Sequence, residues 1–241
     1  MNGTSTVSSS TLMHHRMAGQ PAEAPSTRST ISAVLITKNE ASQITPCFRS
    51  LTGWVDEIVV LDSGSTDATL DIARQHGAKV FVREDWKGFG IQRQRAQDLA
   101  TSDYILAIDA DERISKELRE AIESILRNPD KNCLYQVVRQ NAFLDKDVFH
   151  NGWRREKIVR LFAKNNFQFN SRAVHESVDS KGIPTQTLHG YLIHDACRNY
   201  EYYLEKHLAY AHSWARDQAK SGKSANLLNA ITHGLTTFVR L

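Results

Sequence analysis

Three acidic side chains lie close together at the end of an apolar run. The run Tyr104–Ile108 carries no charge, and Asp109, Asp111 and Glu112 follow it directly. An uninterrupted apolar run predicts a buried, parallel strand, whose C-terminal end would present the three carboxylates to solvent. In open α/β sheets, ligands bind at that edge. Because clustered carboxylates repel one another, the pattern favours a hard divalent cation shared with substrate phosphates.

A purely structural explanation of these acids also exists. Acidic residues after a strand often do no more than cap the following helix. Here Ser115 is the expected N-cap of that helix, and Glu117 lies in its first turn. Asp109 and Asp111 are therefore not needed for capping, and the local stretch alone leaves a metal–phosphate site and a structural role both open.

Composition limits the class of protein. The chain has 241 residues, 41% hydrophobic and 24% charged, which suits one large domain or one domain with appendages. A net charge of +3 is too small to indicate nucleic acid. Cys47, Cys133 and Cys197 are far apart, so they predict neither a zinc site of usual spacing nor a disulfide framework, and a reducing compartment is expected. No run approaches the ~20 apolar residues that span a bilayer.

Strands and helices alternate in the first half of the chain. Residues 1–30 are rich in Ser, Thr, Ala and Pro, and we expect a disordered lead-in there. Strand patterns follow at 32–37, 56–61, 79–82 and 104–109. A helical pattern follows each strand, at 46–51, 67–76, 90–100 and 115–127. Thr45 is the expected N-cap of the first helix. This order predicts βαβ units with right-handed crossovers, and hence an α/β fold with a mostly parallel sheet.

The second half is less regular. Strand candidates are expected at 133–139, 157–162, 172–178 and 186–194, and 141–156 is expected to be a loop that shapes a binding surface. From Tyr200 to Ala215 a 3.6-residue apolar period predicts a helix that packs on the main domain or contacts a membrane. A further amphipathic piece runs to Leu241. The predicted organisation is a lead-in (1–30), one domain (31–197, with halves 31–127 and 128–197) and a helical C-terminal region (198–241).

Three polar segments now stand at the ends of successive predicted strands: Thr37–Glu40, Asp62–Asp67 and Asp109–Glu112. Together they resemble the family-2 glycosyltransferases of the GT-A fold. Further segments are similar to a subgroup that includes bacterial lipopolysaccharide-core β-1,4-glucosyltransferases: Trp86–Arg93, Arg160–Phe162, Val174–Glu176 and Leu192–His194. One departure is Gln94, where the resemblance leads us to expect Asn.

The resemblance implies a role for each matching residue. The nucleotide-sugar pocket would be lined by Thr37, Asn39, Glu40, Asp62, Arg93, Asp109 and Ala110. Asp62 would accept hydrogen bonds from uracil or ribose, and Asp109 would contact ribose or metal. Arg93 would lie near the diphosphate, with a solvated helix face as its alternative. Asp111 and His194 would bind Mg²⁺ or Mn²⁺.

The chemistry requires one more group. The metal stabilises the leaving diphosphate, and an inverting transfer also needs a base for the acceptor hydroxyl. Glu176 is the predicted base, with Asp179 and Asp195 as substitutes. His175 would pack or orient Glu176. Trp153 would stack on a sugar or cover the core.

The resemblance therefore implies an inverting, metal-dependent glycosyltransferase that moves a hexose, expected to be glucose, from a UDP-sugar. The expected acceptor is a heptose of the lipopolysaccharide inner core, with another lipid-linked or polysaccharide acceptor as the alternative. Such acceptors are anchored in the cytoplasmic leaflet, so we expect a cytoplasmic enzyme in peripheral contact with the inner face of the bacterial inner membrane, and no nucleic-acid partner.

Two rival functions rank lower. A sugar nucleotidyltransferase needs a Gly-rich basic loop after the first strand, whereas Thr37–Glu40 offers one lysine and no glycine. A non-catalytic carbohydrate-binding or lipid-binding module would not need the full set of acids found here.

Overall fold

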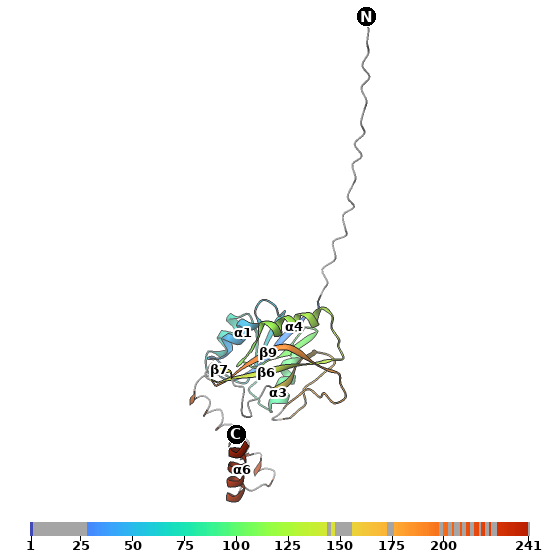
Figure 1. The fold of residues 1–241 in the computed structure, drawn as a ribbon. Helices are drawn as coiled ribbons and strands as arrows, with labels where there is room; N and C mark the ends of the chain where they lie inside the picture. Colours follow the sequence, from blue (N-terminus) through green and yellow to red (C-terminus); the bar gives the residue numbers. More distant parts are fainter. Residues whose placement is uncertain are drawn as a thin grey trace.

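A computed structural model describes residues 1, 28–143, 146–147, 156–172, 176–197 and 226–240, with single positions between 200 and 222. It shows one curved sheet with helices on both faces (Figure 1). The elements in chain order are β1 (Ile31–Thr37), α1 (Ile44–Leu51), β2 (Glu57–Asp62), α2 (Thr69–Gln75), β3 (Lys79–Val82), α3 (Phe89–Leu99), β4 (Tyr104–Ala107), β5 (Glu112–Ile114), α4 (Lys116–Arg127), β6 (Leu134–Phe143), β7 (Lys146–Asp147), β8 (Glu156–Ala163), β9 (Thr185–Cys197) and α6 (Leu227–Arg240).

The strand order is β3-β2-β1-β4-β8-β6-β9-β5, and β7 pairs with β6. Strands β1 to β4 are parallel, as the alternation of strands and helices predicts. Antiparallel pairs enter where β8 joins β4 and where β5 joins β9. The predicted α/β class with a mostly parallel sheet and flanking helices is confirmed, and the antiparallel strands belong to the second half of the chain.

Two apolar cores cover the two faces of the sheet. Ile31, Ala33 and Leu35 of β1 pack in the core that contains α1 and α4, whereas Val34 packs in the core that contains α3. Figure 1 shows α1 and α4 on one side of the sheet and α3 on the other. Because successive strand residues point to opposite faces, burial on both sides explains why β1 is an unbroken apolar run.

Two boundaries in the first half differ from the prediction. Helix α1 begins at Ile44, with Gln43 at its N-cap, because the backbone amides of both residues already bond to the Glu40 carbonyl. Strand β4 ends at Ala107 rather than at Asp109, and Glu112 opens β5, which was not predicted. A three-residue strand has too short a pattern to be recognised from sequence.

The second half contains two further corrections. Strand β6 continues to Phe143 and forms a hairpin with β7, so the segment predicted as a loop begins as sheet. The strand expected at 172–178 is absent from the described residues there, where the only pairing is a bridge between Phe169 and Val178. Trp153, Val174 and His175 lie outside the described residues.

The curl of the sheet places the acidic segment. Strands β4 and β5 are joined by residues 108–111 alone, yet they lie four positions apart in the strand order. The sheet must therefore bend so that its last strand returns to the end of β4. As a result, Asp109 and Asp111 lie where the two halves of the domain meet.

The C-terminal segments expose their apolar residues. Leu228, Ile231 and Leu235 recur at i, i+3 and i+7 in α6 and are 70%, 50% and 60% exposed. In Figure 1, α6 lies apart from the sheet. Tyr200, Leu204 and Leu208 are also exposed, so these described positions do not show the predicted packing on the main domain. Among the residues described, no helix combines the length and hydropathy needed to cross a bilayer.

The ion pair at the start of β2 gives a test of the fold. The Glu57 carboxylate accepts hydrogen bonds from Ser32, Lys79 Nζ (2.7 Å) and the Thr101 amide (2.8 Å). Burial alone would raise its pKa, but the bonds from Lys79 and Ser32 hold the pKa below its ordinary value. A depressed folded-state pKa contributes stability above the unfolded pKa and loses it as the pH falls through the folded pKa.

Glu57→Gln should therefore lower the free energy of unfolding by about 1–3 kcal/mol at pH 7, the range for hydrogen bonds to charged groups. The deficit should begin to shrink as the pH falls below about 4, near the ordinary pKa of Glu, and should be lost only below the lowered pKa of folded Glu57. Urea unfolding from pH 7 to pH 3 measures this. Glu120→Gln, which removes an exposed pair with Lys116, should change little. Equal Glu57→Gln deficits at every pH would contradict the explanation.

Candidate active site

The three clustered acids differ in exposure. The side chain of Asp109 is 28% exposed, that of Asp111 is 8% exposed, and that of Glu112 is fully buried. The prediction that all three face solvent is therefore wrong for Asp111 and Glu112. The reason is that the chain turns into β5 after Asp111 and carries Glu112 into the sheet.

Two buried arginines supply the positive charge beside these acids. Asp109 accepts from Arg93 Nη2 through Oδ1 at 2.6 Å and from Arg160 Nη2 through Oδ2 at 2.8 Å. Glu112 Oε1 accepts from Arg160 at 2.7 Å, and Glu112 Oε2 accepts from the Asp109 amide at 2.9 Å. The cation that the sequence leads us to expect at this cluster is thus partly provided by the protein itself.

The two arginines affect the pKa of Asp109 more strongly than the pKa of Glu112. Burial alone would raise the pKa of Asp109, but Arg93 and Arg160 hold that pKa well below its usual range. Burial raises the pKa of Glu112, and Arg160 only partly offsets it. Asp109 is therefore a firmly ionised bridge between two guanidinium groups.

Asp111 meets His194 because of strand register. Strand β5 pairs with β9 so that Glu112 lies opposite His194, and the Asp195 amide donates to the Asp111 carbonyl at 2.9 Å. His194 Nε2 lies 3.3 Å from Asp111 Oδ2, and His194 Nδ1 lies 2.6 Å from Asn141 Oδ1. Since Asn141 presents an oxygen, Nδ1 is the donor in that contact, and Nε2 is the ring nitrogen that faces the Asp111 carboxylate. A proton on Nε2 or a metal ion shared by the two side chains would satisfy this contact.

A divalent ion fits this pair. Ligand bonds of about 2.1 Å in octahedral geometry bring neighbouring ligand atoms to about 3 Å from each other, near the 3.3 Å observed. The described residues contain no group of three or more His, Cys, Asp or Glu side chains arranged around a metal. Such ions are commonly held by one or two protein ligands together with substrate phosphates. Asn141, which the sequence does not single out, fixes the ring of His194 as an outer-shell partner would.

Asp62 organises the loop after β2. Its Oδ1 accepts from the Gly64 and Ser65 amides at 2.8 and 2.7 Å, and its Oδ2 accepts from the Thr37 and Ser65 hydroxyls at 2.9 and 2.5 Å. A carboxylate offers about four acceptor positions, so these bonds use its capacity. Direct bonding to uracil or ribose, as the resemblance implies, would require one of these donors to leave.

Asn39 joins the loop after β1 to the loop after β2. It is a non-glycine residue with positive φ (57°), a conformation that Asn tolerates better than most residues. Its amide donates to Ser65 Oγ at 2.8 Å, and its side-chain oxygen accepts from the Thr66 amide at 2.8 Å. The Glu40 amide donates to Thr69. The structure thus brings Thr37, Asn39 and Asp62 together, with Ser65 and Thr66 as structural partners.

Glu176 reaches the acidic cluster through Arg93. Arg93 Nε donates to Glu176 Oε1 at 2.6 Å while its Nη2 bonds to Asp109. The Arg93 side chain is 7% exposed, so its alternative as a solvated helix face is wrong. The predicted base therefore lies one guanidinium group away from Asp109.

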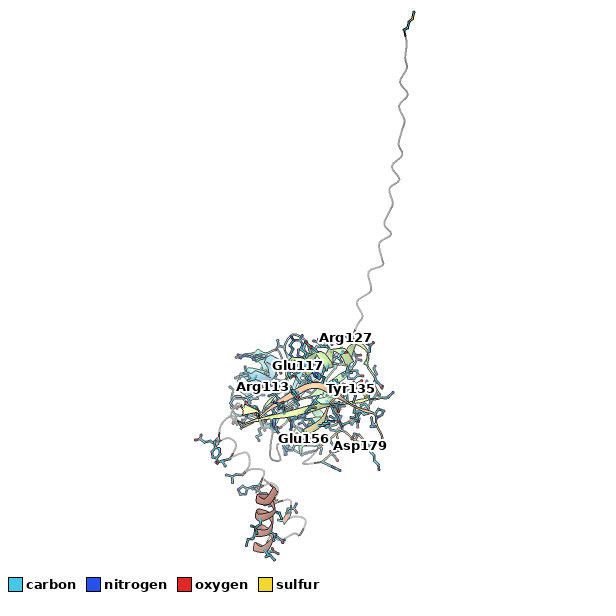
Figure 2. All side chains as sticks on the ribbon, viewed as in Figure 1. Arg113, Glu117, Arg127, Tyr135, Glu156 and Asp179 are labelled. Atoms are coloured by element: carbon cyan, nitrogen blue, oxygen red, sulfur yellow. The ribbon has the colours of Figure 1, made fainter. Side chains whose placement is uncertain are left out.

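The two substitute bases lie in different surroundings. Asp179 is exposed and caps its own turn by accepting from the Lys181 amide. Figure 2 shows Asp179 at one margin of the domain and Arg113, which follows Glu112, at the other. Asp195 is buried beside Asp111. Of the two, only Asp195 lies next to the acidic segment.

Helix α3 anchors the segment that leads to Glu176. Gln94 accepts from the Phe169 amide at 2.9 Å, and Gln97 donates to the Phe167 carbonyl at 2.7 Å. Gly90 approaches the same segment so closely that a Cβ there would lie 2.0 Å from the Asn170 carbonyl oxygen. Gln94, the departure from the expected Asn, is therefore a tie between α3 and this segment.

Sequence reasoning gave no role to Arg160. It lies in the stretch Arg160–Phe162 that carried part of the resemblance, and it is buried at 7% exposure. The sequence did offer one signal: Arg160 comes directly before the apolar end of a predicted strand. A charged side chain in the core of a sheet needs a partner of opposite charge, so this position predicts an ion pair.

Comparison with known proteins agrees with this fold. The model of "Glycosyl transferase family 2" matches residues 32–181. An uncharacterized glycosyltransferase of Rickettsia felis is 33% identical over 227 residues, covering 87% of this chain and 77% of its own length. The lipopolysaccharide core biosynthesis glycosyltransferase LpsC of Rhizobium meliloti is 29% identical over 216 residues, covering 88% and 80%.

The solved structure of S. aureus TarS 1-349 in complex with UDP-GlcNAc has a TM-score of 0.51 at 19% identity, covering 70% of this chain and 59% of that chain. This likeness concerns the fold. Fold and matches together define a GT-A glycosyltransferase. The chain belongs to glycosyl transferase family 2.

The arginine–carboxylate cluster predicts an asymmetric effect on stability. Arg160→Met should lower the free energy of unfolding by about 3–5 kcal/mol, because it removes the guanidinium that is hydrogen-bonded to the buried Glu112 and leaves Arg139 Nη1 at a longer distance of 3.8 Å. The double variant Arg160→Met/Glu112→Gln should recover part of that loss. Urea unfolding at pH 7 measures both variants, and Arg74→Met, which breaks an exposed pair with Asp71, is the control. A loss below about 1 kcal/mol for Arg160→Met would contradict the explanation that Arg160 offsets a buried charge on Glu112.

Proposed function

We propose that this chain is an inverting, metal-dependent glycosyltransferase that moves a hexose, in our proposal glucose, from a UDP-sugar to a heptose of the lipopolysaccharide inner core. Another lipid-linked or polysaccharide acceptor is the alternative. The observation that carries the proposal is the meeting, at the end of β4, of the Asp111–His194 pair with the Asp109–Arg93–Glu176 chain. The similarity to LpsC, named for lipopolysaccharide core biosynthesis, supports the acceptor class.

The donor nucleotide would bind over the loops after β1 and β2, which Asn39 joins. Thr37, Asn39 and Glu40 would line the pocket, and Asp62 would hold the shape of the loop that completes it. Asp109 and Ala110 would face the ribose and diphosphate. Because these loops are already hydrogen-bonded to each other, little ordering would be needed when the donor binds.

Asp111 and His194 would hold Mg²⁺ or Mn²⁺. Such an ion, when bound, offsets the negative charge that develops on the leaving diphosphate. Asn141 keeps the proton on Nδ1 of His194, which leaves Nε2 as the ligand atom.

Glu176 would act as the base. The acceptor hydroxyl oxygen attacks the anomeric carbon, and the Glu176 carboxylate takes the hydroxyl proton. The bond from the anomeric carbon to the diphosphate oxygen breaks, and its electron pair leaves with UDP. Attack opposite the leaving group inverts the configuration of the sugar.

UDP release from a panel of UDP-sugars tests this function, with Mn²⁺, Mg²⁺ or EDTA and a truncated lipopolysaccharide core as acceptor. We expect acceptor-stimulated, metal-dependent release from one donor. Asp111→Ala should abolish metal-dependent turnover without unfolding the protein, whereas the exposed Asp179→Ala should turn over normally. Normal turnover of Asp111→Ala would refute the metal assignment.

The same measurements distinguish the proposed function from the alternative functions. UDP binding by calorimetry without turnover on any acceptor would keep the donor site and refute the lipopolysaccharide acceptor. Absence of both UDP binding and turnover would favour the carbohydrate-binding module. Release of pyrophosphate from a nucleoside triphosphate and a sugar phosphate would identify a nucleotidyltransferase instead.

We also propose peripheral contact with the cytoplasmic face of the bacterial inner membrane, through α6. Its exposed stripe of Leu228, Ile231 and Leu235 is apolar, and no Asp or Glu follows Asp217 in the sequence, whereas Lys220, Lys223 and Arg240 are basic. An apolar stripe with basic neighbours suits the surface of an anionic bilayer. Self-association of these helices would bring like charges together, so a lipid surface is the better occupant.

Co-sedimentation with vesicles tests this contact. The full chain should bind vesicles that contain phosphatidylglycerol more tightly than pure phosphatidylcholine, and binding should weaken with salt. Leu228→Asn/Ile231→Asn/Leu235→Asn should lose binding, while Trp86→Ser, at another exposed apolar residue, should retain it. Concentration-dependent dimerisation without vesicle binding would assign the stripe to a second copy.

A further inference from the structure

We propose that Arg93 is a positioning residue that fixes the base Glu176 relative to Asp109, rather than a ligand of the donor diphosphate. The inference rests on the proposed function, because it takes Glu176 as the base. It departs from what the resemblance implies for Arg93, and it follows from the contacts of this side chain.

The Arg93 guanidinium is committed to two carboxylates. Nε donates to Glu176 Oε1 and Nη2 donates to Asp109 Oδ1, both at 2.6 Å. The guanidinium carbon also lies 5.9 Å from the centre of the Phe169 ring. Because guanidinium is planar and its donors are fixed in direction, contacts with three separate segments define one orientation of the side chain.

Moving Arg93 to a diphosphate would break this arrangement. Its side chain is 7% exposed, and that of Glu176 is 17% exposed. Removing one member of a buried, hydrogen-bonded ion pair leaves an uncompensated charge, which is costly. The donor would have to meet that cost, whereas the Asp111–His194 pair offers a separate place for a cation that binds the diphosphate.

The contacts also determine which atom of Glu176 does the chemistry. Arg93 Nε holds Oε1, and no hydrogen bond to Oε2 is found among the described residues, so Oε2 would accept the proton of the acceptor hydroxyl. Asp109 cannot turn away, because Arg160 holds its other oxygen. The base is therefore placed by a chain of bonds that begins at Glu112 and runs through Arg160, Asp109 and Arg93.

Arg93→Lys is the first test. Lysine keeps the charge but is a point donor on a flexible stem, so it cannot hold both carboxylates in a fixed geometry. We expect kcat to fall by about 10-fold to 100-fold, as for a misplaced catalytic group. The donor KM and the Kd for UDP from calorimetry should stay within about two-fold of wild type, because uniform binding is unchanged. A large rise in the Kd for UDP would show that Arg93 binds the diphosphate and would overturn the inference.

A double-mutant cycle shows whether Arg93 acts through Glu176. In a Glu176→Gln background, Arg93→Lys should cause little further loss of kcat, because residues that act as a unit are strongly non-additive. Losses that multiply would overturn the inference. Arg95→Lys, on the same helix and paired with Asp85, should leave kcat unchanged. Arg93→Gln, which keeps one donor without the charge, replaces Arg93→Lys in the cycle if the lysine variant unfolds.

Failure of the proposed function can be distinguished from failure of the positioning role of Arg93. Wild-type protein that releases UDP from no donor would refute the glycosyltransfer proposed here, and with it the role of Glu176 as the base. Wild-type turnover with multiplicative losses, or with weaker UDP binding in Arg93→Lys, refutes only the positioning role.

Discussion

The site depends on two buried arginines that neutralise an acidic cluster. Glu112 is fully buried and Asp109 is 28% exposed beside it, and Arg93 and Arg160 offset the cost of placing these carboxylates close together. Buried ion pairs seldom stabilise a fold more than apolar residues of the same size would. The arrangement is therefore better explained by orientation, because it holds Asp109 by both oxygens and leaves Asp111 to face His194.

The topology follows from the same requirement. Arg93 comes from α3 on one face of the sheet, and Arg160 comes from β8, which lies beside β4 in the sheet. The curl that returns β5 to the end of β4 sets Glu112 opposite His194. One bend of the sheet thus places the arginine-held acids and the candidate metal ligands next to each other.

Local pattern was enough to predict the first four strands and the helices between them, although it missed β5. Apolar runs predicted β1 to β4, and the Ser115 side chain does accept from the Leu118 amide as a helix N-cap. What could not be predicted depends on contacts between distant residues. The acids alone indicate that some cation is needed, but they cannot tell a metal ion from Arg160. Likewise, nothing local shows that Glu112 enters a strand, that Asn141 holds His194, or that Gln94 ties α3 to the segment before Glu176.

The site also shows how far the predicted halves, 31–127 and 128–197, can be considered separately. Three pairs of the site join one half to the other: Asp111 with His194, Asp109 with Arg160, and Arg93 with Glu176. The Arg93–Asp109 pair lies within the first half. The first half supplies the loops after β1 and β2 and the acids, but it has neither the candidate base nor the imidazole. The second half supplies these two groups, and its Arg160 balances charges that belong to the first. The candidate base and the candidate metal ligands would therefore both be positioned by contacts that cross the boundary between the halves.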